Sequence, residues 1–349
     1  MRAGMGKLAD ITGIHSPYFI AEMSANHGND LDVALSIVEE AARAGADCLK
    51  VQTYTADTLT LNCDNDYFRI KGGLWDGQLL YDLYSDASFP WEWHEPVIEK
   101  CREVGIDFLS TPFDKSAVDF LVELGVEAFK IASFELVDIP LIQYAASKQK
   151  TMIMSTGMAT LDEIGEAVEA VRREGNDKIC LLRCCSEYPA DPADMNLASI
   201  PDLAQRFGCA IGFSDHSRGH LADVIAAALG ARVIEKHFCL NREIETADSE
   251  FSMTPSEYEA MVKAVRDTVV AVGAPSYNAS AKERQSLVFR RSVFASAPIQ
   301  AGELFSPENI RVVRPGYGAK PKYYEALLGS HADRAYDFGE PIIYEESCE

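Results

Sequence analysis

A short apolar run followed by a helical pattern recurs along most of the chain, and this repeat constrains the fold more than any other feature. In the first unit, the run at 18–23 precedes a segment, 31–44, whose apolar residues recur every three or four positions and which stops at Gly45. That spacing predicts an amphipathic helix after a strand. The eight apolar runs lie at 18–23, 48–53, 107–112, 128–133, 151–157, 179–184, 212–217 and 233–238.

Eight strand–helix units of this length predict a (β/α)8 TIM barrel, an α/β fold. The main competitor, a doubly wound open sheet, rarely has eight regular units, and no GxGxxG motif follows the first run. In a barrel all strands end on the same face, where the active site lies.

The repeat stops at Gly273, after a last helical pattern at 255–272. Short strand-like runs with turn residues resume near Arg290. We therefore expect a barrel domain at 1–273, a linker at 274–289 and a small, mostly β domain at 290–349.

Composition excludes several classes of function. A formal net charge of −22 argues against nucleic acid as a partner, because a phosphate backbone requires clustered Lys and Arg. No apolar run approaches the roughly 18–20 residues of a membrane span. The nine cysteines are odd in number and form no CxxC pair, which favours reduced thiols. Residues 1–16 have no signal-peptide pattern, so we expect a cytoplasmic protein.

The predicted strand ends carry cations and hydroxyls although the chain is strongly acidic. Buried cations need anions, so these residues predict a site for a small anionic substrate. The lysines are Lys50, Lys130 and Lys236, and the hydroxyl residues are Thr111, Ser133, Ser155, Ser186 and Ser214.

Carboxylates and a histidine join the same ring of strand ends. Glu22 and Glu135 are candidates for proton transfer or for holding sugar hydroxyls. Pairing with Lys50 and Lys130 is an equally good interpretation. His27 follows the first strand and could touch substrate.

His216 and His237 follow two neighbouring parallel strands. Converging imidazoles suit a divalent metal, but a purely structural role explains them equally well. The chain has no GxSxG or P-loop motif. A metal, an anion pocket and carboxylates on one barrel suit carbon–carbon bond formation between a phosphorylated enol and a carbonyl compound.

The sequence resembles the sialic acid synthase family, which condenses phosphoenolpyruvate with an amino sugar. The end of the chain, with Arg314-Pro315-Gly316, resembles the antifreeze-like (SAF) domain of that family. The motifs that carry the resemblance are at 21–27, 50–54, 110–113, 130–133, 155–157, 214–217 and 235–238.

The resemblance implies a role for each matching residue. His216 and His237 would hold a divalent metal, Mn²⁺ or Mg²⁺, against the sugar aldehyde. Phosphoenolpyruvate would be bound by Lys50, Lys130, Ser133, Ser155 and Ser214, with Thr111, Ser186 and Lys236 nearby. Glu22 and Asp248 would position the sugar or move protons, with Glu135 and Tyr188 in support. Sugar contacts would come from Gln52, Asn26, His27 and Arg314.

One branch of the family fits best. Residues 54–61, 74–78, 80–84 and 90–94 resemble the pseudaminic acid branch, which uses 2,4-diacetamido-2,4,6-trideoxy-L-altrose. Ser186-Glu187-Tyr188-Pro189 stands where the N-acetylneuraminate branch has Asn-x-Tyr-Pro. All three tryptophans lie in or beside the long insertion after the second strand, which could wall the sugar pocket.

The resemblance also implies a domain-swapped homodimer in which each small domain caps the partner's barrel. Folding of the small domain onto its own barrel is the alternative. N-acetylneuraminate and legionaminate synthases remain alternatives within the family. Outside it, a metal-dependent aldolase that uses free pyruvate and a catalytically silent carbohydrate-binding protein remain open.

Overall fold

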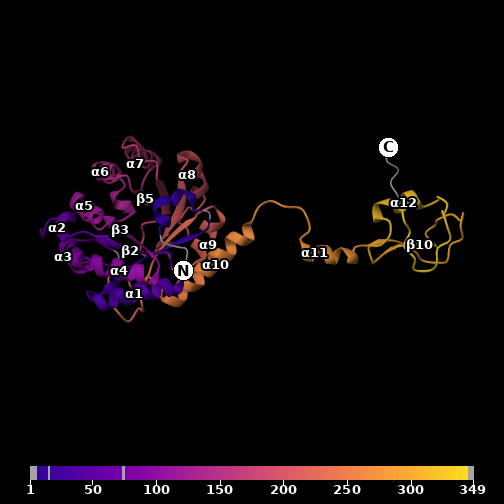
Figure 1. Cartoon of the computed structure of the whole chain (residues 1–349), viewed down its shortest axis with the longest axis horizontal. Helices are drawn as coiled ribbons and strands as arrows, with labels where there is room; N and C mark the ends of the chain where they lie inside the picture. The colour runs from indigo at the N-terminus through magenta and orange to yellow at the C-terminus, as the bar shows by residue number, and fades with distance from the viewer. Residues whose placement is uncertain (1–5, 15, 73–74, 345–349) are drawn as a thin grey trace. The chain divides into compact units, whose positions relative to one another are not determined.

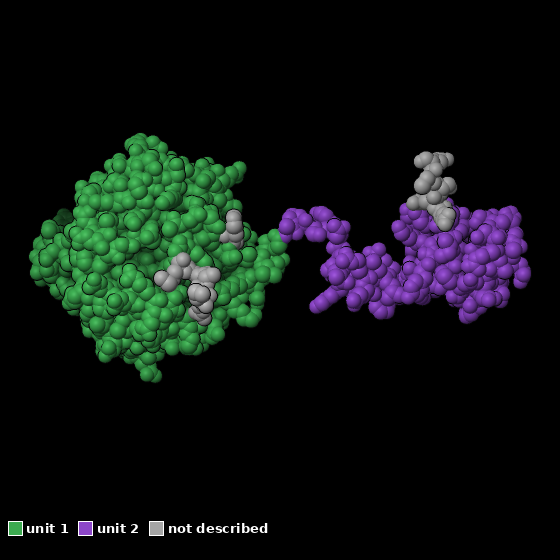
Figure 2. Space-filling view, in the orientation of Figure 1, with its two compact units in different colours: residues 1–273 green, residues 274–349 purple. Residues whose placement is uncertain are grey.

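The chain forms two compact units, residues 1–273 and 274–349, shown in different colours in Figure 2. A computed structural model describes residues 6–14, 16–72 and 75–344. The outer ends of both expected domains, 1–5 and 345–349, therefore lie outside the described residues.

Unit 1 is a closed barrel of eight parallel strands, as the repeat predicts. β1 pairs with both β2 and β8, and the β1–β8 register runs from Tyr18 beside Val233 to Glu22 beside His237. The strands are β1 Tyr18–Glu22, β2 Cys48–Thr53, β3 Asp107–Pro112, β4 Ala128–Ile131, β5 Thr151–Ser155, β6 Ile179–Cys184, β7 Ala210–Asp215 and β8 Val233–His237.

Helices surround the barrel (Figure 1). α1 begins where the Asp30 side chain accepts hydrogen bonds from the backbone of Asp32 and Val33, and it ends at left-handed Gly45. The main helices are α1 Leu31–Ala44, α4 His94–Val104, α5 Lys115–Glu123, α6 Ile139–Ser147, α7 Leu161–Arg173, α8 Ser199–Phe207, α9 Leu221–Ala228 and α10 Pro255–Val272.

Each strand alternates between the barrel interior and the layer beneath the helices. In β1, Tyr18 and Ile20 pack inside the barrel, whereas Phe19 and Ala21 belong to the larger core shared with the helices. A 3-10 helix at Lys7–Gly13 closes the N-terminal end of the barrel with Leu8 and Ile11. Inward positions change from apolar to polar only at the C-terminal strand ends, so polar side chains gather on one face.

The insertion after β2, residues 54–89, is folded rather than a bare loop. It contains α2 (Ala56–Leu59) and α3 (Leu80–Ala87), and a hairpin between them pairs Arg69 with Leu79. The short helix Trp91–Trp93 follows it and leads into α4.

Unit 2 has its own core around a two-stranded antiparallel sheet of β9 (Ser292–Ala295) and β10 (Ile310–Val313). The other elements are the 3-10 helix Pro321–Tyr323 and α12 (Tyr324–Leu327). The segment 274–289 is not wholly irregular, because it holds α11 (Ala281–Ser286) and the 3-10 helix Leu287–Phe289. Ser280 caps α11 by accepting from the Glu283 amide, a local signal that the composition of the segment obscured.

Candidate active site

Four buried charged residues form the centre of the polar face inside the barrel. Lys50 Nζ lies 2.7 Å from Glu22 Oε2 and 3.7 Å from Glu235 Oε1. Lys130 Nζ lies 3.5 Å from the same oxygen of Glu235. Two lysines thus face two glutamates, but the shortest ion pair of Lys130, with Glu235, is longer than the shortest ion pair of Lys50, with Glu22.

Burial and neighbouring charges act in opposite directions on these groups. Burial lowers the pKa of Lys130 more than Glu235 raises it. For Lys50, Glu22 and Glu235 outweigh burial, and its pKa rises. Burial raises the pKa of Glu22, whereas Lys130 and Lys50 overcome burial at Glu235 and lower its pKa. Lys130 is therefore the cation that the protein compensates least, and an anion placed beside it would be stabilised.

Hydroxyl groups surround the two lysines. Thr111 Oγ1 accepts from Lys50 Nζ at 3.4 Å, and Ser214 donates to Glu235 at 3.2 Å. The buried Ser155 Oγ has no hydrogen-bond partner among the described residues. A buried hydroxyl without a partner costs free energy, which a bound oxyanion would recover.

Ser133 and Ser186 meet over Gly157 at the same end of the barrel. Ser133 Oγ accepts from the Gly157 amide at 3.1 Å. A Cβ at position 157 would lie 2.1 Å from Ser186 Oγ and 2.7 Å from Ser133 Oγ, so only glycine allows both serines to occupy this place.

His216 and His237 converge beside the charged ring, with 5.4 Å between their ring centroids. His216 Nδ1 is 2.9 Å from the Cys185 carbonyl oxygen, an arrangement that fixes the ring and leaves Nε2 as the free ligand atom. His237 Nδ1 is buried and has no hydrogen-bond partner among the described residues, and burial holds its pKa well below the usual value. Both imidazoles therefore fit a divalent metal.

The described residues contain no cluster of three or more His, Cys, Asp and Glu side chains that could hold a metal ion. Two histidine ligands would thus require water or substrate oxygens to complete the coordination. The buried Cys184 thiol lies 3.7 Å from His216 Nδ1. Although burial would lower the pKa of His216, this thiol raises it. Burial would raise the pKa of Cys184, but His216, with help from Ser133 and Lys130, lowers it to about 7.

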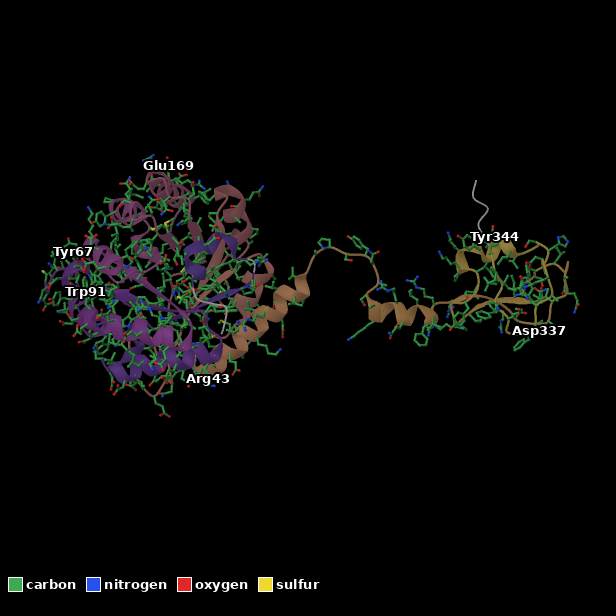
Figure 3. The ribbon with its side chains drawn as sticks, in the orientation of Figure 1. Arg43, Tyr67, Trp91, Glu169, Asp337 and Tyr344 are labelled. Carbon is green, nitrogen blue, oxygen red and sulfur yellow. The ribbon has the colours of Figure 1, made fainter. Side chains whose placement is uncertain are left out.

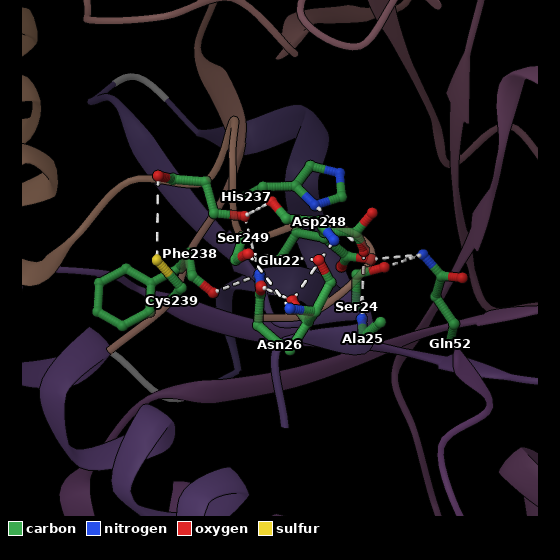
Figure 4. Close-up of polar contacts among 12 residues, drawn as sticks. Glu22, Ser24, Ala25, Asn26, Gln52, His237, Phe238, Cys239, Asp248 and Ser249 are labelled. Carbon is green, nitrogen blue, oxygen red and sulfur yellow. Dashed lines mark hydrogen bonds and ion pairs between the residues drawn. The ribbon is translucent and has the colours of Figure 1, made fainter. Parts of the chain in front are cut away.

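Gln52, Glu22 and Asp248 gather around Ser24 and Ala25 between the charged ring and His237 (Figure 4). Gln52 donates to Glu22 at 2.8 Å and to Ser24 at 3.0 Å. Asp248 accepts from the Ala25 amide at 3.2 Å and lies 4.0 Å from His237 Nδ1. Burial raises the pKa of Asp248, which suits a group that exchanges a proton.

Glu135 and Tyr188 complete the wall of the site. Glu135 Oε2 is buried without a partner among the described residues, and burial raises its pKa to about 7. The Tyr188 ring lies over His216 with 4.3 Å between centroids and reaches Trp75 of the insertion at 6.1 Å.

A cavity of about 720 Å³ opens between these strand ends and the insertion. It is large enough for a substrate of drug-like size. Its polar lining includes Ser24, Gln52, Glu135, Ser186, Tyr188, His237 and Asp248.

Lys236 does not join the site, although the sequence predicted that it would. Glu235 and His237 face the barrel interior, so the alternation of β8 turns Lys236 to the opposite side. There its ammonium group contacts Asp215, donates to the Ser217 carbonyl at 2.6 Å and to the Gly219 carbonyl at 3.0 Å, and lies 3.9 Å from Asp223. Lys236 therefore holds the loop after β7 and does not face the cavity.

Asn26 and His27, two further predicted sugar contacts, are instead held by contacts within the protein. Asn26 donates to the Phe238 carbonyl at 3.0 Å and to Ser252 at 2.8 Å, as Figure 4 shows in part. It thereby anchors the loop that carries Asp248. His27 is buried against Phe89 and Trp93, with ring centroids 5.4 and 5.6 Å away, and it is not among the cavity-lining residues.

Arg314 and two of the three tryptophans are not part of this cavity in unit 1. Arg314 belongs to unit 2, where its side chain is exposed. Of the three tryptophans, only Trp75 lines the cavity. Trp91 packs on Phe120 and lies toward the edge of unit 1 (Figure 3), and Trp93 packs on Phe89.

Sequence reasoning missed Glu235, Cys184 and Ser24. Glu235 directly precedes Lys236, and a lysine at a strand end is the stronger signal for an anion site. The two-residue period of β8, counted back from His237, would have placed Glu235 inside the barrel and Lys236 outside. The same period places Cys184 inside β6, two residues after the interior Leu182.

Comparison with known proteins agrees with this architecture. The family model described as NeuB family matches residues 37–277, and the SAF domain model matches residues 290–343. The chain is 46% identical to pseudaminic acid synthase of Campylobacter jejuni over 93% of this chain and 95% of that protein. It is 34% identical to N,N'-diacetyllegionaminic acid synthase of Legionella pneumophila over 94% of each.

A solved structure resembles the chain in three dimensions. The N-acetylneuraminic acid synthetase of Leptospira borgpetersenii, crystallised with citrate, superposes with a TM-score of 0.70 at 32% identity. The match covers 78% of this chain and 90% of that one.

Proposed function

The chain belongs to the NeuB family, and from this we propose that it condenses phosphoenolpyruvate with 2,4-diacetamido-2,4,6-trideoxy-L-altrose. The products are pseudaminic acid, a nine-carbon 2-keto sugar acid, and inorganic phosphate. The observation that carries the choice of sugar is the identity of 46% to a pseudaminic acid synthase, against 34% to a legionaminic acid synthase over nearly the same length.

Phosphoenolpyruvate binds at the charged ring in this proposal. Its phosphate and carboxylate would accept hydrogen bonds from Lys50, Lys130 and Ser155, whose buried donors favour an anion. The serines gathered at Gly157 lie at the same strand ends and would complete the anion site. The contacts that support this are the long Lys130–Glu235 pair of 3.5 Å and the unpartnered Ser155 hydroxyl.

The reaction forms one carbon–carbon bond and replaces the C2–O bond to phosphate with a C2–O bond to water. C3 of phosphoenolpyruvate attacks the aldehyde carbon of the open-chain sugar, and the aldehyde oxygen takes a proton to become a hydroxyl group. Water adds at C2, and phosphate leaves with cleavage of the C2–O bond. Asp248 and Glu22 would position the sugar or move these protons; both are buried with raised pKa values, and Gln52 donates a hydrogen bond to Glu22.

His216 and His237 would hold the divalent metal, either Mn²⁺ or Mg²⁺. When bound, the metal supplies Lewis-acid polarisation of the sugar carbonyl. Tyr188 packs on His216 and excludes water from that side of the site.

The proposal includes assembly and location. We expect a homodimer in which the SAF domain of a second copy covers the cavity and supplies Arg314. Exposed apolar residues on the strand-end loops, Phe134, Val137 and Met158, support a covering partner there. No helix of the described residues could cross a membrane. The described cysteines are free thiols, which supports the proposal that the protein is located in the reducing cytoplasm.

A phosphate-release assay tests the proposed function. Phosphoenolpyruvate is supplied with 2,4-diacetamido-2,4,6-trideoxy-L-altrose, its legionaminate-type stereoisomer or N-acetylmannosamine, with and without a chelator. We expect fastest release with the first sugar and loss of release with chelator. Preference for N-acetylmannosamine would refute the sugar assignment, and condensation of free pyruvate without phosphate release would favour an aldolase. Full activity of a monomer in sedimentation would refute the dimer.

A further inference from the structure

The cavity has two sides of different chemistry. One side is made by strand ends and their loops and holds most of the polar lining, although Phe113, Ala132, Phe134 and Ala247 also line it; the polar residues include Ser24, Gln52, Glu135, Ser186, His237 and Asp248. The opposite side comes from the insertion at 54–89, and apart from Lys71 and Gly72 its lining is apolar or aromatic: Tyr54, Leu59, Ile70, Trp75, Leu80, Leu83, Tyr84 and Ala87.

The hairpin of the insertion is held by its own backbone. The Ile70 amide donates to the Gln78 carbonyl, the Gly77 amide donates to the Ile70 carbonyl, and both distances are 2.9 Å. The Leu80 amide donates to the Phe68 carbonyl at 2.9 Å, so the first residue of α3 is tied to the hairpin. These bonds fix Ile70 and Leu80 on the same wall.

The wall is also attached to the barrel. Asn29 Nδ2 donates to the Asp86 carbonyl at 3.1 Å at the end of α3. Trp91 Nε1 donates to the Tyr54 carbonyl at 3.2 Å at the start of the insertion. Tyr54 packs edge-on against Tyr84 and Phe113, with centroids 6.1 and 5.2 Å apart. The apolar side is therefore preformed, and little ordering is needed when a sugar binds.

We propose that this apolar wall selects the amino sugar by its methyl groups. The inference rests on the proposed function and identifies how that site distinguishes among hexoses. The proposal places the aldehyde beside His216 and His237 and the far end of the sugar against the insertion, which lines the same cavity as His237. A methyl group placed against Ile70 and Leu83, from a deoxy carbon or an N-acetyl group, fills apolar surface, whereas a hydroxyl group there loses its hydrogen bonds to water without gaining a partner from these two side chains.

Ile70 and Leu83 are the specificity-determining residues in this view. They come from different elements of the insertion, the hairpin and α3, and both are half-buried. Apolar pockets discriminate modestly against an added hydroxyl group, so we expect the wall to contribute about 10- to 100-fold to the preference.

The test compares two sugars in three variants. Phosphate release is measured with the 2,4-diacetamido-2,4,6-trideoxy sugar and with N-acetylmannosamine for Ile70→Asn, Leu83→Asn and Leu61→Asn. Leu61 lies in the same insertion but is 66% exposed and outside the cavity lining, so it is the matched control. We expect the ratio of kcat/KM for the two sugars to fall about 10-fold or more in Ile70→Asn and Leu83→Asn, with KM for phosphoenolpyruvate unchanged.

A ratio within twofold of the unmodified protein in both variants, with normal thermal unfolding, would overturn the proposal. Calorimetric binding of the two reduced, unreactive sugar alcohols to the protein loaded with Mn²⁺ and phosphoenolpyruvate measures the same preference without turnover. If the unmodified protein releases no phosphate with any sugar, the proposed function fails. The binding ratio then still decides whether the wall prefers methyl groups.

Discussion

The strand ends of the barrel and the insertion at 54–89 face the same cavity but are built differently. The strand ends carry buried charges whose partners lie within 4 Å, such as Lys50 with Glu22 and Lys130 with Glu235. The insertion presents half-buried apolar side chains on a hairpin and two short helices. The rigid sheet can hold charges at fixed distances, which chemistry requires, whereas the insertion can change its side chains without disturbing the barrel. Our proposals therefore assign catalysis and the choice of substrate to separate parts of the chain.

The largest effect should follow from removing a histidine at the strand ends. In His237→Ala we expect phosphate release to fall by about 1,000-fold or more, because one of the two proposed protein ligands to the metal is lost. Mn²⁺ binding, followed by electron paramagnetic resonance of the free ion, should weaken while the circular dichroism spectrum stays unchanged. His331→Ala, at an exposed histidine of unit 2, is the control. Undiminished activity in His237→Ala would contradict the ligand role.

Replacement of a lysine in the charged ring should act on phosphoenolpyruvate rather than on the sugar. In Lys130→Met we expect kcat/KM for phosphoenolpyruvate to fall about 100- to 1,000-fold, because a buried donor to the anion is lost. The preference between the two sugars should stay the same. Lys148→Met, at a surface lysine paired with Asp119, should leave the kinetics unchanged. A shift in sugar preference with Lys130→Met would contradict the proposal that the strand ends act on phosphoenolpyruvate and the insertion on the choice of sugar.

Lys236, on the side of β8 that faces away from the barrel interior, should affect the stability of the fold more than the rate of phosphate release. Lys236→Met leaves Asp215 and Asp223 buried without their cation, and Asp223 is 0% exposed. We expect the free energy of unfolding to drop by about 3–5 kcal/mol, measured by chemical denaturation. Lys263→Met, at an exposed pair with Asp267, should change it by less than about 0.5 kcal/mol. Equal destabilisation in the two variants would show that the buried pair has no special role.

The smallest effect concerns Glu135 and pH. Burial raises the pKa of this carboxyl group from 4.5 to about 7, so the folded protein binds its proton more tightly than the unfolded chain does. The resulting contribution to stability is present below pH 4.5 and is lost as pH rises toward 7. The loss is at most about 1.4 kcal/mol per pH unit across that window.

Glu135→Gln should remove this dependence. Relative to the unmodified protein, the variant should be more stable at pH 8 than at pH 5, as judged by thermal unfolding at both values. Glu123→Gln, at an exposed carboxylate, should show no such change between the two pH values. A constant difference between Glu135→Gln and the unmodified protein from pH 5 to pH 8 would argue against a buried, proton-binding Glu135.

The sequence by itself determined the barrel, the small second domain and most of the strand-end residues. The reason is local: apolar runs, helix caps and glycine stops each specify a strand or helix, and parallel connections bring the strand ends to one face. The sequence alone therefore predicts that His216, His237, Lys50 and Lys130 lie at this face.

Tertiary structure alone decided which side of a strand end faces the cavity and which partners fill it. Lys236 and Glu235 are neighbours in sequence, yet only Glu235 lies between Lys50 and Lys130. Asn26 and His27 match the same motif as Glu22, yet they support a loop and an aromatic cluster. The sequence of the insertion and of the short helix after it did not reveal that Trp75 lines the cavity while Trp91 and Trp93 do not. Such differences depend on side-chain direction and on contacts between distant segments, and no local pattern in the sequence encodes them.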